Sequence, residues 1–444
     1  MKTPICDFVK EYNDSQSIRM HMPGHKGKGS YEMLDITEID GADVLYNAGG
    51  IIKESEENAA ALFGSAKTLY SAEGSSLSVR AMLYLAVLYA KICGKKPLIA
   101  AGRNAHKTFI SAAALLDFDI DWLYGDESIM SCNVTGEMLK DYFEKTDSLP
   151  VAVYVTSPDY LGNTLDVASL SEICHAHGVL LLVDNAHGAY LKFLKEDMHP
   201  ITLGADVCCD SAHKTLPVLT GGGYLHISKN APSVFSLRAE DAMSLFASTS
   251  PSYLILQSLD KANAYLADRY SEKLAAFCEK VAELKENLRK NEYTLLGNEP
   301  LKITFFAKEY GYTGTDLAKI LANHNIFCEF YDSDFLTLML TPENTDCELR
   351  ALESALLSVE KAPAITSSAP KIPSLCKVMS PREATMSRSE EIDTADAYGR
   401  ILASASVSCP PAIPIAVCGE RLDKNAVECF KYYGIEKCRV VNEK

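Results

Sequence analysis

The sequence predicts an α/β protein whose large domain contains a mostly parallel sheet, followed by a smaller α+β domain at the C-terminus. Strand-like and helical patterns alternate from about residue 55 to 230, and this alternation is typical of βαβ units. The strand segments are short and apolar, such as 180–183, as expected where helices cover both faces of a sheet. The length of 444 residues exceeds one typical domain, so two or three domains are expected.

Residues 1–30 are predicted to form an arm, with one or two helical turns over 7–12 and a loop rich in glycine over 22–29. The large domain is expected to span residues 31–250. Its expected helices are 78–93, 107–116, 136–145 and 167–177. Its expected strands are 97–101, 120–123, 151–156, 179–183, 207–210 and 223–227.

The C-terminal half begins with a helical pattern over 251–291 that has few breakers, and we expect it to be a linking helix. Residues 292–444 are expected to form the α+β domain, with strands at 301–306 and 335–340. A stretch rich in proline and serine at 362–374 is a possible boundary inside this domain.

The composition excludes some classes of function. A formal net charge of -16, from 59 acidic and 43 basic residues, argues against nucleic acid as a partner. It is compatible with a cationic substrate, although an acidic surface more often serves solubility. The 14 cysteines are irregularly spaced, which favours reduced core thiols over disulfides or a metal site. Neither a signal peptide nor a membrane span is predicted, since the apolar stretch 81–93 is short and carries Lys91; a cytoplasmic location is expected.

Two polar motifs follow neighbouring strands of the predicted sheet. Ser211-Ala212-His213-Lys214 follows one strand, and Asp184 ends the strand before it. Ligands of open α/β sheets bind at the carboxyl ends of strands. A lysine that forms a Schiff base with the aldehyde, and an aspartate that pairs with the pyridinium nitrogen, are what pyridoxal 5'-phosphate (PLP) requires of a protein. A lone lysine is usually solvated, but this place, followed by Gly221-Gly222-Gly223, favours a PLP site.

Weaker motifs precede these two along the chain. Gly74, Ser75 and Ser76 precede a helix and could bind a phosphate, although a plain helix cap explains them as well. His106 could stack on a pyridine ring or merely cap the next helix, and Thr156 could bond the cofactor phenolate. For each motif alone, a structural role such as a helix cap is favoured over a role in binding. The order of all the motifs along the chain, however, is that of a fold-type-I PLP enzyme, with the aspartate aminotransferase-like fold.

The chain also resembles one family, the Orn/Lys/Arg decarboxylases, over nearly its whole length. The motifs that carry the resemblance are His21-Met22-Pro23-Gly24-His25-Lys26, Asp35-Ile36-Thr37-Glu38, Gly41-Ala42-Asp43, Gly74-Ser75-Ser76, Arg103-Asn104-Ala105-His106-Lys107, Asp184-Asn185-Ala186-His187-Gly188, Ser211-Ala212-His213-Lys214-Thr215, Ser248-Thr249-Ser250-Pro251-Ser252-Tyr253, Ser380-Pro381-Arg382-Glu383-Ala384, and Pro410-Pro411-Ala412-Ile413-Pro414 followed by Gly419-Glu420. The chain starts almost at the arm and so resembles the short form that lacks the N-terminal wing domain. It departs from the family where Cys418 stands in place of a proline.

This resemblance implies PLP-dependent decarboxylation of a basic amino acid, as in polyamine metabolism, with arginine first and then lysine or ornithine. It implies a homodimer, or a higher assembly of dimers, with shared sites. The implied catalytic residues are Lys214, Asp184 and His106. The implied cofactor contacts are Lys214, Asp184, Ala186, His187, His106, Gly74, Ser75, Ser76, Thr156, Ser211 and His213, with Ser248 and Thr249 reaching a neighbouring subunit. Glu420 and His25 are the implied substrate contacts.

Two other functions remain open at the level of sequence. A PLP aminotransferase or carbon–carbon lyase of the same fold would share Lys214 and Asp184, but an aminotransferase would release a keto acid rather than CO2. An inactive regulatory paralogue would be expected to lose Lys214 or Asp184, and both are present.

Overall fold

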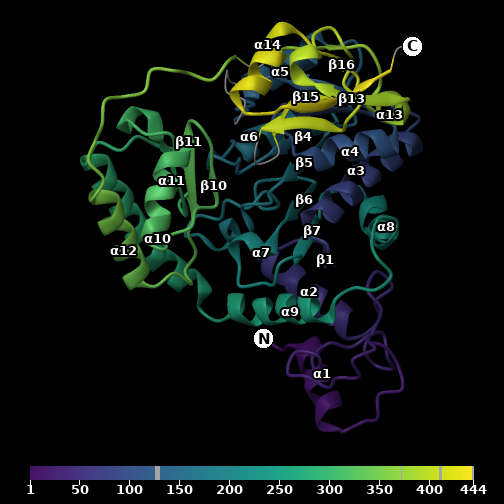
Figure 1. The fold of residues 1–444 in the computed structure, drawn as a ribbon. Helices are drawn as coiled ribbons and strands as arrows, with labels where there is room; N and C mark the ends of the chain where they lie inside the picture. Colours follow the sequence, from purple (N-terminus) through teal and green to yellow (C-terminus); the bar gives the residue numbers. More distant parts are fainter. Residues whose placement is uncertain (126–130, 372, 410–412, 443–444) are drawn as a thin grey trace. The chain divides into compact units, whose positions relative to one another are not determined.

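The computed structural model describes residues 1–125, 131–371, 373–409 and 413–442, which form two compact units. The first unit comprises Met1–Pro97, Thr146–Tyr154 and Asp166–Leu274. The second comprises Leu98–Lys145, Val155–Leu165 and Ala275–Lys444. Strand β4 (Ala152–Thr156) and helix α10 (Tyr270–Lys290) each run from one unit into the other (Figure 1).

The first unit contains a sheet with helices packed on it. Its helical elements are α1 (Pro4–Asp14), α2 (Ile51–Phe63), α3 (Ser75–Ile92), α6 (Val167–Ala176), η1 (Ala189–Phe193), α7 (Ala212–Thr215), α8 (Ser233–Ser244) and α9 (Tyr253–Ala267). Its strands are β1 (Lys67–Ser71), β5 (Leu180–Asp184), β6 (Val207–Asp210) and β7 (Gly223–Ile227), with the start of β4, in the order β1-β7-β6-β5-β4. The expected strands of this region are present, and β1 is an additional strand that the sequence pattern did not indicate.

The direction of β7 departs from a purely parallel sheet. Strands β5 and β6 run parallel, whereas β7 runs antiparallel to both β6 and β1. The chain between β6 and β7 spans only residues 211–222 and contains one short helical turn. A parallel return usually carries a full crossover helix, whereas α7 has only 4 residues, so this connection favours the antiparallel pairing.

Helix α3 is the long buried helix of the first unit. It packs against β6, β7 and α8. It is long and apolar enough to cross a membrane, but 56% of its apolar window is buried inside the protein, as in a core helix. The helix begins at Ser75 rather than near Ser78, because Gly74 adopts φ 70° and reverses the chain immediately before it.

Residues 251–291 form two helices, so the prediction of a single linking helix is wrong. Helix α9 ends at Ala267, and α10 begins at Tyr270. Arg269 between them adopts φ 57°, in the left-handed region that interrupts a right-handed helix. In the arm, α1 is also longer than the one or two turns expected, and Asp260 on α9 accepts the N–H groups of Ile5 and Cys6, both at 3.0 Å.

The second unit contains two α+β regions besides a pair of parallel strands. Its helical elements are α4 (Lys107–Leu116), α5 (Gly136–Lys145), η2 (Ala307–Tyr310), α11 (Gly314–Asn323), α12 (Asp346–Leu357), α13 (Pro381–Met386), η3 (Thr394–Asp396) and α14 (Lys424–Tyr432). Its strands are β2 (Leu98–Gly102), β3 (Asp119–Leu123), β8 (Leu295–Leu296), β9 (Lys302–Phe306), β10 (Phe330–Tyr331), β11 (Phe335–Met339), β12 (Cys376–Lys377), β13 (Ser389–Asp393), β14 (Ser406–Cys409), β15 (Ile413–Val417), β16 (Glu420–Arg421) and β17 (Lys437–Val441).

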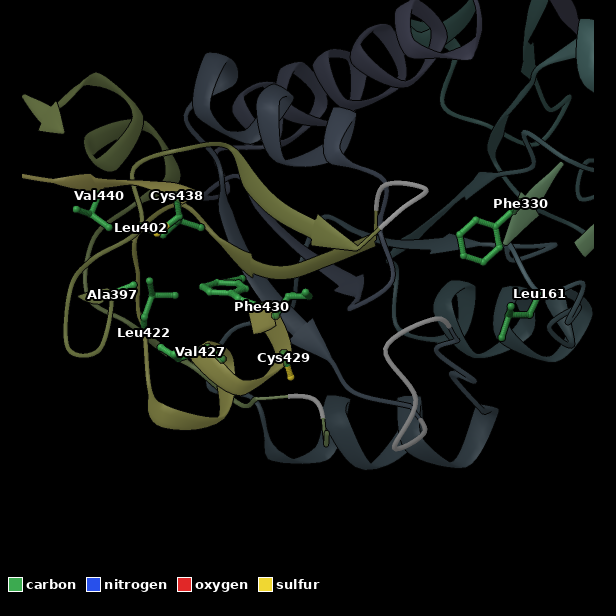
Figure 2. Close-up of a cluster of buried hydrophobic side chains, with 13 residues drawn as sticks. Leu161, Phe330, Ala397, Leu402, Leu422, Val427, Cys429, Phe430, Cys438 and Val440 are labelled. Atoms are coloured by element: carbon green, nitrogen blue, oxygen red, sulfur yellow. The ribbon is translucent and has the colours of Figure 1, made fainter. Parts of the chain in front are cut away.

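Strands β2 and β3 run parallel, as predicted, and β10-β11-β9-β8 form an antiparallel sheet that includes the two strands expected near 301–306 and 335–340. The C-terminal region has a buried cluster in which Phe430 and Val427 of α14 accompany Leu402, Leu422 and Val440 (Figure 2). This cluster gives the last 80 or so residues of the second unit an apolar core.

Residues 362–371 have no regular secondary structure, as expected of a boundary, although Ala362 N–H bonds Tyr310 O and Lys308 Nζ bonds Ser367 O. Residue 372 of the predicted boundary lies outside the described residues. The cysteines whose side chains the structure describes are all free thiols. The expectation that they lie in the core is right for Cys208 and Cys209, but wrong for Cys93, Cys347 and Cys376, which are exposed.

Candidate active site

Lys214 lies on the short turn α7, which directly follows β6. Ser211 precedes that turn, and its carbonyl accepts the N–H of Lys214 at 2.9 Å. The Lys214 Nζ atom lies 3.0 Å from Nε2 of His187, which is 4% exposed and follows the end of β5. Because β5 and β6 run parallel, their carboxyl ends bring the predicted lysine, His187 and Asp184 to one edge of the sheet.

Asp184 ends β5, and its side chain is buried with three donors around it. Its Oδ2 accepts the hydroxyl of Tyr154 at 2.9 Å, and its Oδ1 accepts the N–H of Ala186 at 3.2 Å. The thiol of Cys209, directly opposite on β6, lies 3.6 Å from the same Oδ1. These donors supply the hydrogen bonds that a buried carboxyl group needs and hold its side chain in one orientation at the end of β5.

The predicted phosphate motif is assembled at the N-terminus of α3. The Ser211 hydroxyl donates to Ser75 Oγ at 2.8 Å, and His213 Nδ1 donates to Gly222 O at 2.8 Å. Ser75 and Ser76 occupy the first turn, whose N–H groups lack partners within the helix and favour an anion. A Cβ on Gly223 would lie 2.9 Å from Asp210 O and 3.2 Å from the Gly74 carbonyl carbon, so only glycine allows β7 to pass this close.

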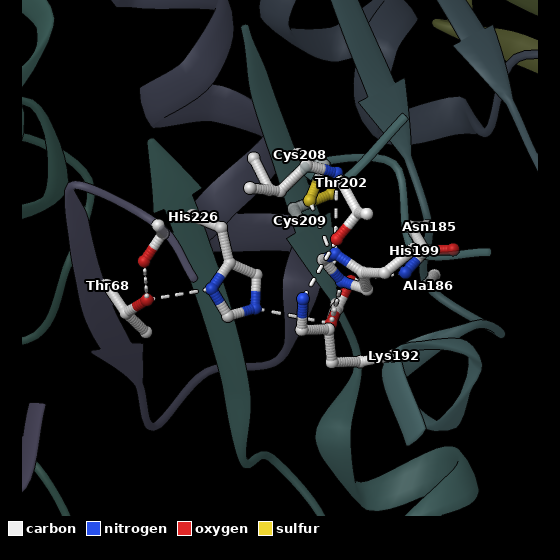
Figure 3. A network of polar contacts seen from close by, with 12 residues as sticks. Thr68, Asn185, Ala186, Lys192, His199, Thr202, Cys208, Cys209 and His226 are labelled. Atoms are coloured by element: carbon white, nitrogen blue, oxygen red, sulfur yellow. Dashed lines mark hydrogen bonds and ion pairs between the residues drawn. The ribbon is translucent and has the colours of Figure 1, made fainter. Parts of the chain in front are cut away.

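A second polar network is centred on Asp210, which ends β6. Figure 3 labels its partners Asn185, His199 and His226. Asn185 Nδ2 donates to Oδ1 of Asp210 at 2.7 Å, and Nε2 of His199 and of His226 lie 3.1 and 3.2 Å from Oδ2. Asp210, His199 and His226 are each 0% exposed. The N–H of Ile201 points at His199 Nδ1, which assigns the ring proton of His199 to Nε2 and makes it a donor to Asp210.

Protonation in this network follows from burial and from the pairing. Burial alone would raise the pKa of Asp210, but the neighbouring His199 and His226 hold that pKa below its ordinary value. Burial lowers the pKa of His226, which is therefore neutral near pH 7. His199, Cys208 and Asp210 also have the residue types of a metal site and lie close together, but the hydrogen bonds above already use the ligand atoms of Asp210 and His199.

Three predicted site residues belong to the second unit. His106 caps α4, with its Nδ1 accepting the N–H of Thr108 at 3.2 Å, so the capping role is confirmed and stacking on a ring stays a prediction. The buried Thr156 Oγ1 has no hydrogen-bond partner among the residues that the structure describes. A hydroxyl in that state is suited to an additional polar group, such as a cofactor oxygen.

Glu420 is 2% exposed and is paired inside the second unit. Its Oε2 accepts the N–H of Val417 at 2.8 Å and lies 3.3 Å from Nη2 of Arg103. Burial raises the pKa of Glu420, against the opposing effects of Arg103 and of the Val417 N–H. Arg103 also donates to the carbonyls of Pro414 and Ile415 and lies over the ring of Trp122. The substrate contact of Glu420 stays a prediction, and residues 410–412 of the adjoining motif lie outside the described residues.

The remaining predicted contacts lie in the arm and in the loop before α9. His25 Nε2 lies 3.1 Å from Asp35 Oδ2, and its Nδ1 accepts the N–H of Gly27 at 3.0 Å. Ser248 and Thr249 are exposed, and the N–H of Ser248 donates to Glu73 at 2.6 Å. Their predicted contact with a neighbouring subunit requires such exposure.

Comparison with known proteins identifies the family. Residues 3–306 match the model of the Orn/Lys/Arg decarboxylase major domain, and residues 368–438 match that of the C-terminal domain. The chain belongs to the Orn/Lys/Arg decarboxylase family. It is 28% identical to an arginine decarboxylase of Bacillus subtilis, over 97% of this chain and 93% of that protein. It is 30% identical to the uncharacterized protein YaaO of the same organism, over 96% of this chain and 93% of that protein.

The solved structures confirm the predicted fold class. The constitutive lysine decarboxylase of E. coli superposes with a TM-score of 0.78 at 16% identity, covering 99% of this chain and 82% of that one. A NIFS-like protein matches with a TM-score of 0.56 at 15% identity, covering 69% of this chain and 86% of that one. At these identities the likeness concerns the fold alone.

Sequence reasoning did not assign roles to Tyr154, Cys209, Asp210 or Arg103. Tyr154 and Cys209 lie inside apolar strand patterns, where a polar atom is easily read as part of the core. The signal that could have found Asp210 is a charged residue at the end of a buried strand, directly before the lysine motif, since such a group needs buried partners.

Proposed function

We propose that this chain is a PLP-dependent decarboxylase of a basic amino acid, and that arginine is the first candidate substrate. Family membership supports the reaction class, and the relatives named arginine decarboxylase match over more than nine-tenths of both chains. The observation that carries the proposal is the placement of Lys214, His187 and Asp184 together at the ends of β5 and β6.

The residues present fit PLP. Lys214 would bind the aldehyde, Asp184 would pair with the ring nitrogen, and the first turn of α3 with Ser75, Ser211 and His213 would hold the phosphate. The unpartnered Thr156 Oγ1 would meet the phenolate oxygen. Bound PLP supplies an electron sink for the electron pair of the bond between Cα and the carboxylate.

Side chains of the protein would hold the proton on the ring nitrogen and supply the proton that the substrate Cα receives. The Asp184 carboxylate, buried and charged, would keep the proton on the ring nitrogen, since opposite charges favour that state. Lys214 Nζ, once the substrate amine has replaced it, would lie within hydrogen-bond reach of His187 Nε2. His187 could then hold or return a proton of the lysine, which helps Lys214 deliver a proton to the substrate Cα.

Substrate charge and assembly complete the proposal. The distal cation of a basic amino acid requires a matched acidic group when it is buried, and Glu420 and His25 are the predicted contacts. The enzyme would be a cytoplasmic homodimer, or an assembly of dimers, in which Ser248 and Thr249 approach the phosphate of a neighbour.

Product analysis tests the proposal directly. The purified protein, reconstituted with PLP, is incubated separately with arginine, lysine and ornithine, and CO2 and amine are quantified. We expect equal amounts of both from one of the three, with arginine first, and no product from Lys214→Ala. Formation of a keto acid without CO2 would instead identify an aminotransferase. PLP binding with no product from any substrate would point to a regulatory paralogue.

A further inference from the structure

The carboxylate of Asp184 is held from the strands on either side of it. Tyr154 comes from β4 and Cys209 from β6, and both are 0% exposed. Their hydroxyl and thiol reach different oxygens of the carboxylate, Oδ2 at 2.9 Å and Oδ1 at 3.6 Å. We propose that Tyr154 and Cys209 are positioning residues that orient Asp184 so that its Oδ2 receives the ring N–H of the cofactor; this rests on the function proposed above.

Counting the acceptor positions of Asp184 supports this orientation. An ionised carboxylate offers about four lone-pair directions, two on each oxygen. The two lone-pair directions of Oδ1 accept hydrogen bonds from the Ala186 N–H and from the Cys209 thiol. One lone-pair direction of Oδ2 accepts the hydrogen bond of the Tyr154 hydroxyl. Among the residues that the structure describes, the one acceptor position left therefore lies on Oδ2.

Both side chains are donors throughout the working range of an enzyme. Burial, followed by the nearby Asp184, raises the pKa of the Tyr154 hydroxyl well above its ordinary value. Burial and then Asp184 likewise raise the pKa of the Cys209 thiol. Each group therefore keeps its proton near neutral pH, and each can only donate toward the charged carboxylate.

The chain offers a matched control for each residue. Tyr224 is also 0% exposed and lies in the first unit, but its hydroxyl has no hydrogen-bond partner in the described part of the chain. Cys174 is another thiol with 0% exposure, and it lies on α6. Tyr224→Phe and Cys174→Ala therefore remove the same atoms from buried places without touching Asp184.

The decisive experiment is a double-mutant cycle between Tyr154→Phe and Asp184→Asn in the holoenzyme. The readouts are the dissociation constant of PLP, the pH dependence of the visible absorbance of bound PLP, and the separate values of kcat and KM. We expect Tyr154→Phe to lower kcat about tenfold, as the loss of one bond to a charged group predicts, and to shift the absorbance titration, with KM changed less than twofold. In the Asp184→Asn background, Tyr154→Phe should change neither kcat nor the absorbance titration any further.

The cysteine is tested by Cys209→Ala and Cys209→Ser, because serine restores a donor. We expect alanine to shift the absorbance titration in the same direction as Tyr154→Phe, and serine to return it toward wild type. Overturning results are a Tyr154→Phe enzyme that behaves like Tyr224→Phe, or an equal effect of Tyr154→Phe with and without the Asp184 carboxylate. Failure of the proposed function is distinguishable, because the wild type would then bind no PLP or release no amine.

Discussion

Replacing Asp210 by asparagine tests the buried network behind the lysine turn. The side chain of Asp210 is 0% exposed and accepts hydrogen bonds from Asn185, His199 and His226. Asparagine retains one acceptor oxygen, so its NH2 group must face either the Asn185 donor or the two imidazole N–H groups. Either orientation leaves at least two buried N–H donors without an acceptor, at about 1–3 kcal/mol each, which is a large part of the stability of an ordinary domain.

The assay is urea unfolding of the PLP-free protein followed by circular dichroism, with Asp206→Asn as the control. Asp206 is also buried, at 3% exposure, but its side-chain partner among the described residues is the ring of His175, which is partly exposed, beside the Leu181 N–H. We expect a loss of about 2–6 kcal/mol for Asp210→Asn and about 1–2 kcal/mol for Asp206→Asn. Equal losses, or a loss below about 1 kcal/mol for Asp210→Asn, would refute the reasoning.

Three further predictions follow from the same geometry. Lys214→Ala should abolish the visible absorbance of bound PLP, and borohydride reduction of the wild type followed by mass spectrometry should place the pyridoxyl group on Lys214; labelling of another lysine would contradict this. Glu420→Gln should raise KM several-fold with unchanged unfolding if the residue meets substrate, whereas lower thermal stability with unchanged KM would identify it as the counter-ion of Arg103. Stability should be constant above about pH 6.5 and fall below it, because His226 has a lowered pKa in the fold and the unfolded chain then binds the additional proton; thermal unfolding from pH 8 to 5 measures this, and a flat profile would show that folding leaves the pKa of His226 unshifted.

The sequence predicted where the strands lie better than it predicted which strands pair and in which direction. Continuous apolar runs located β5 and β6 within a residue of their observed bounds. The antiparallel direction of β7 was not predicted, since a strand's own residues do not record which neighbour it pairs with. The break at Arg269 was missed because neither glycine nor proline marks it, and the residue adopts a left-handed conformation without such a signal.

The same limit applies to the candidate site. Asp184 could be predicted because it ends a strand, and Lys214 because it lies in the turn directly after the next strand, each with a recognisable side chain. The pairing of Glu420 with Arg103 joins residues 317 positions apart, and no local pattern indicates it. Tyr154 acts through a hydroxyl at the tip of an otherwise apolar side chain, so the strand pattern is satisfied whether or not that hydroxyl has a partner.

The relative placement of Asp184 and Lys214 depends on a reciprocal pair of cross-strand contacts. Cys209 of β6 reaches Asp184 of β5, while Asn185, the next residue after Asp184, reaches Asp210, the next residue after Cys209. The Asn185 N–H also donates to Cys209 O at 3.0 Å. Sites held by neighbouring strands are positioned more precisely than sites held by loops. The lysine turn begins two residues after Asp210, so both groups proposed to bind PLP are fixed to the same two strands, and a change at either contact should disturb both.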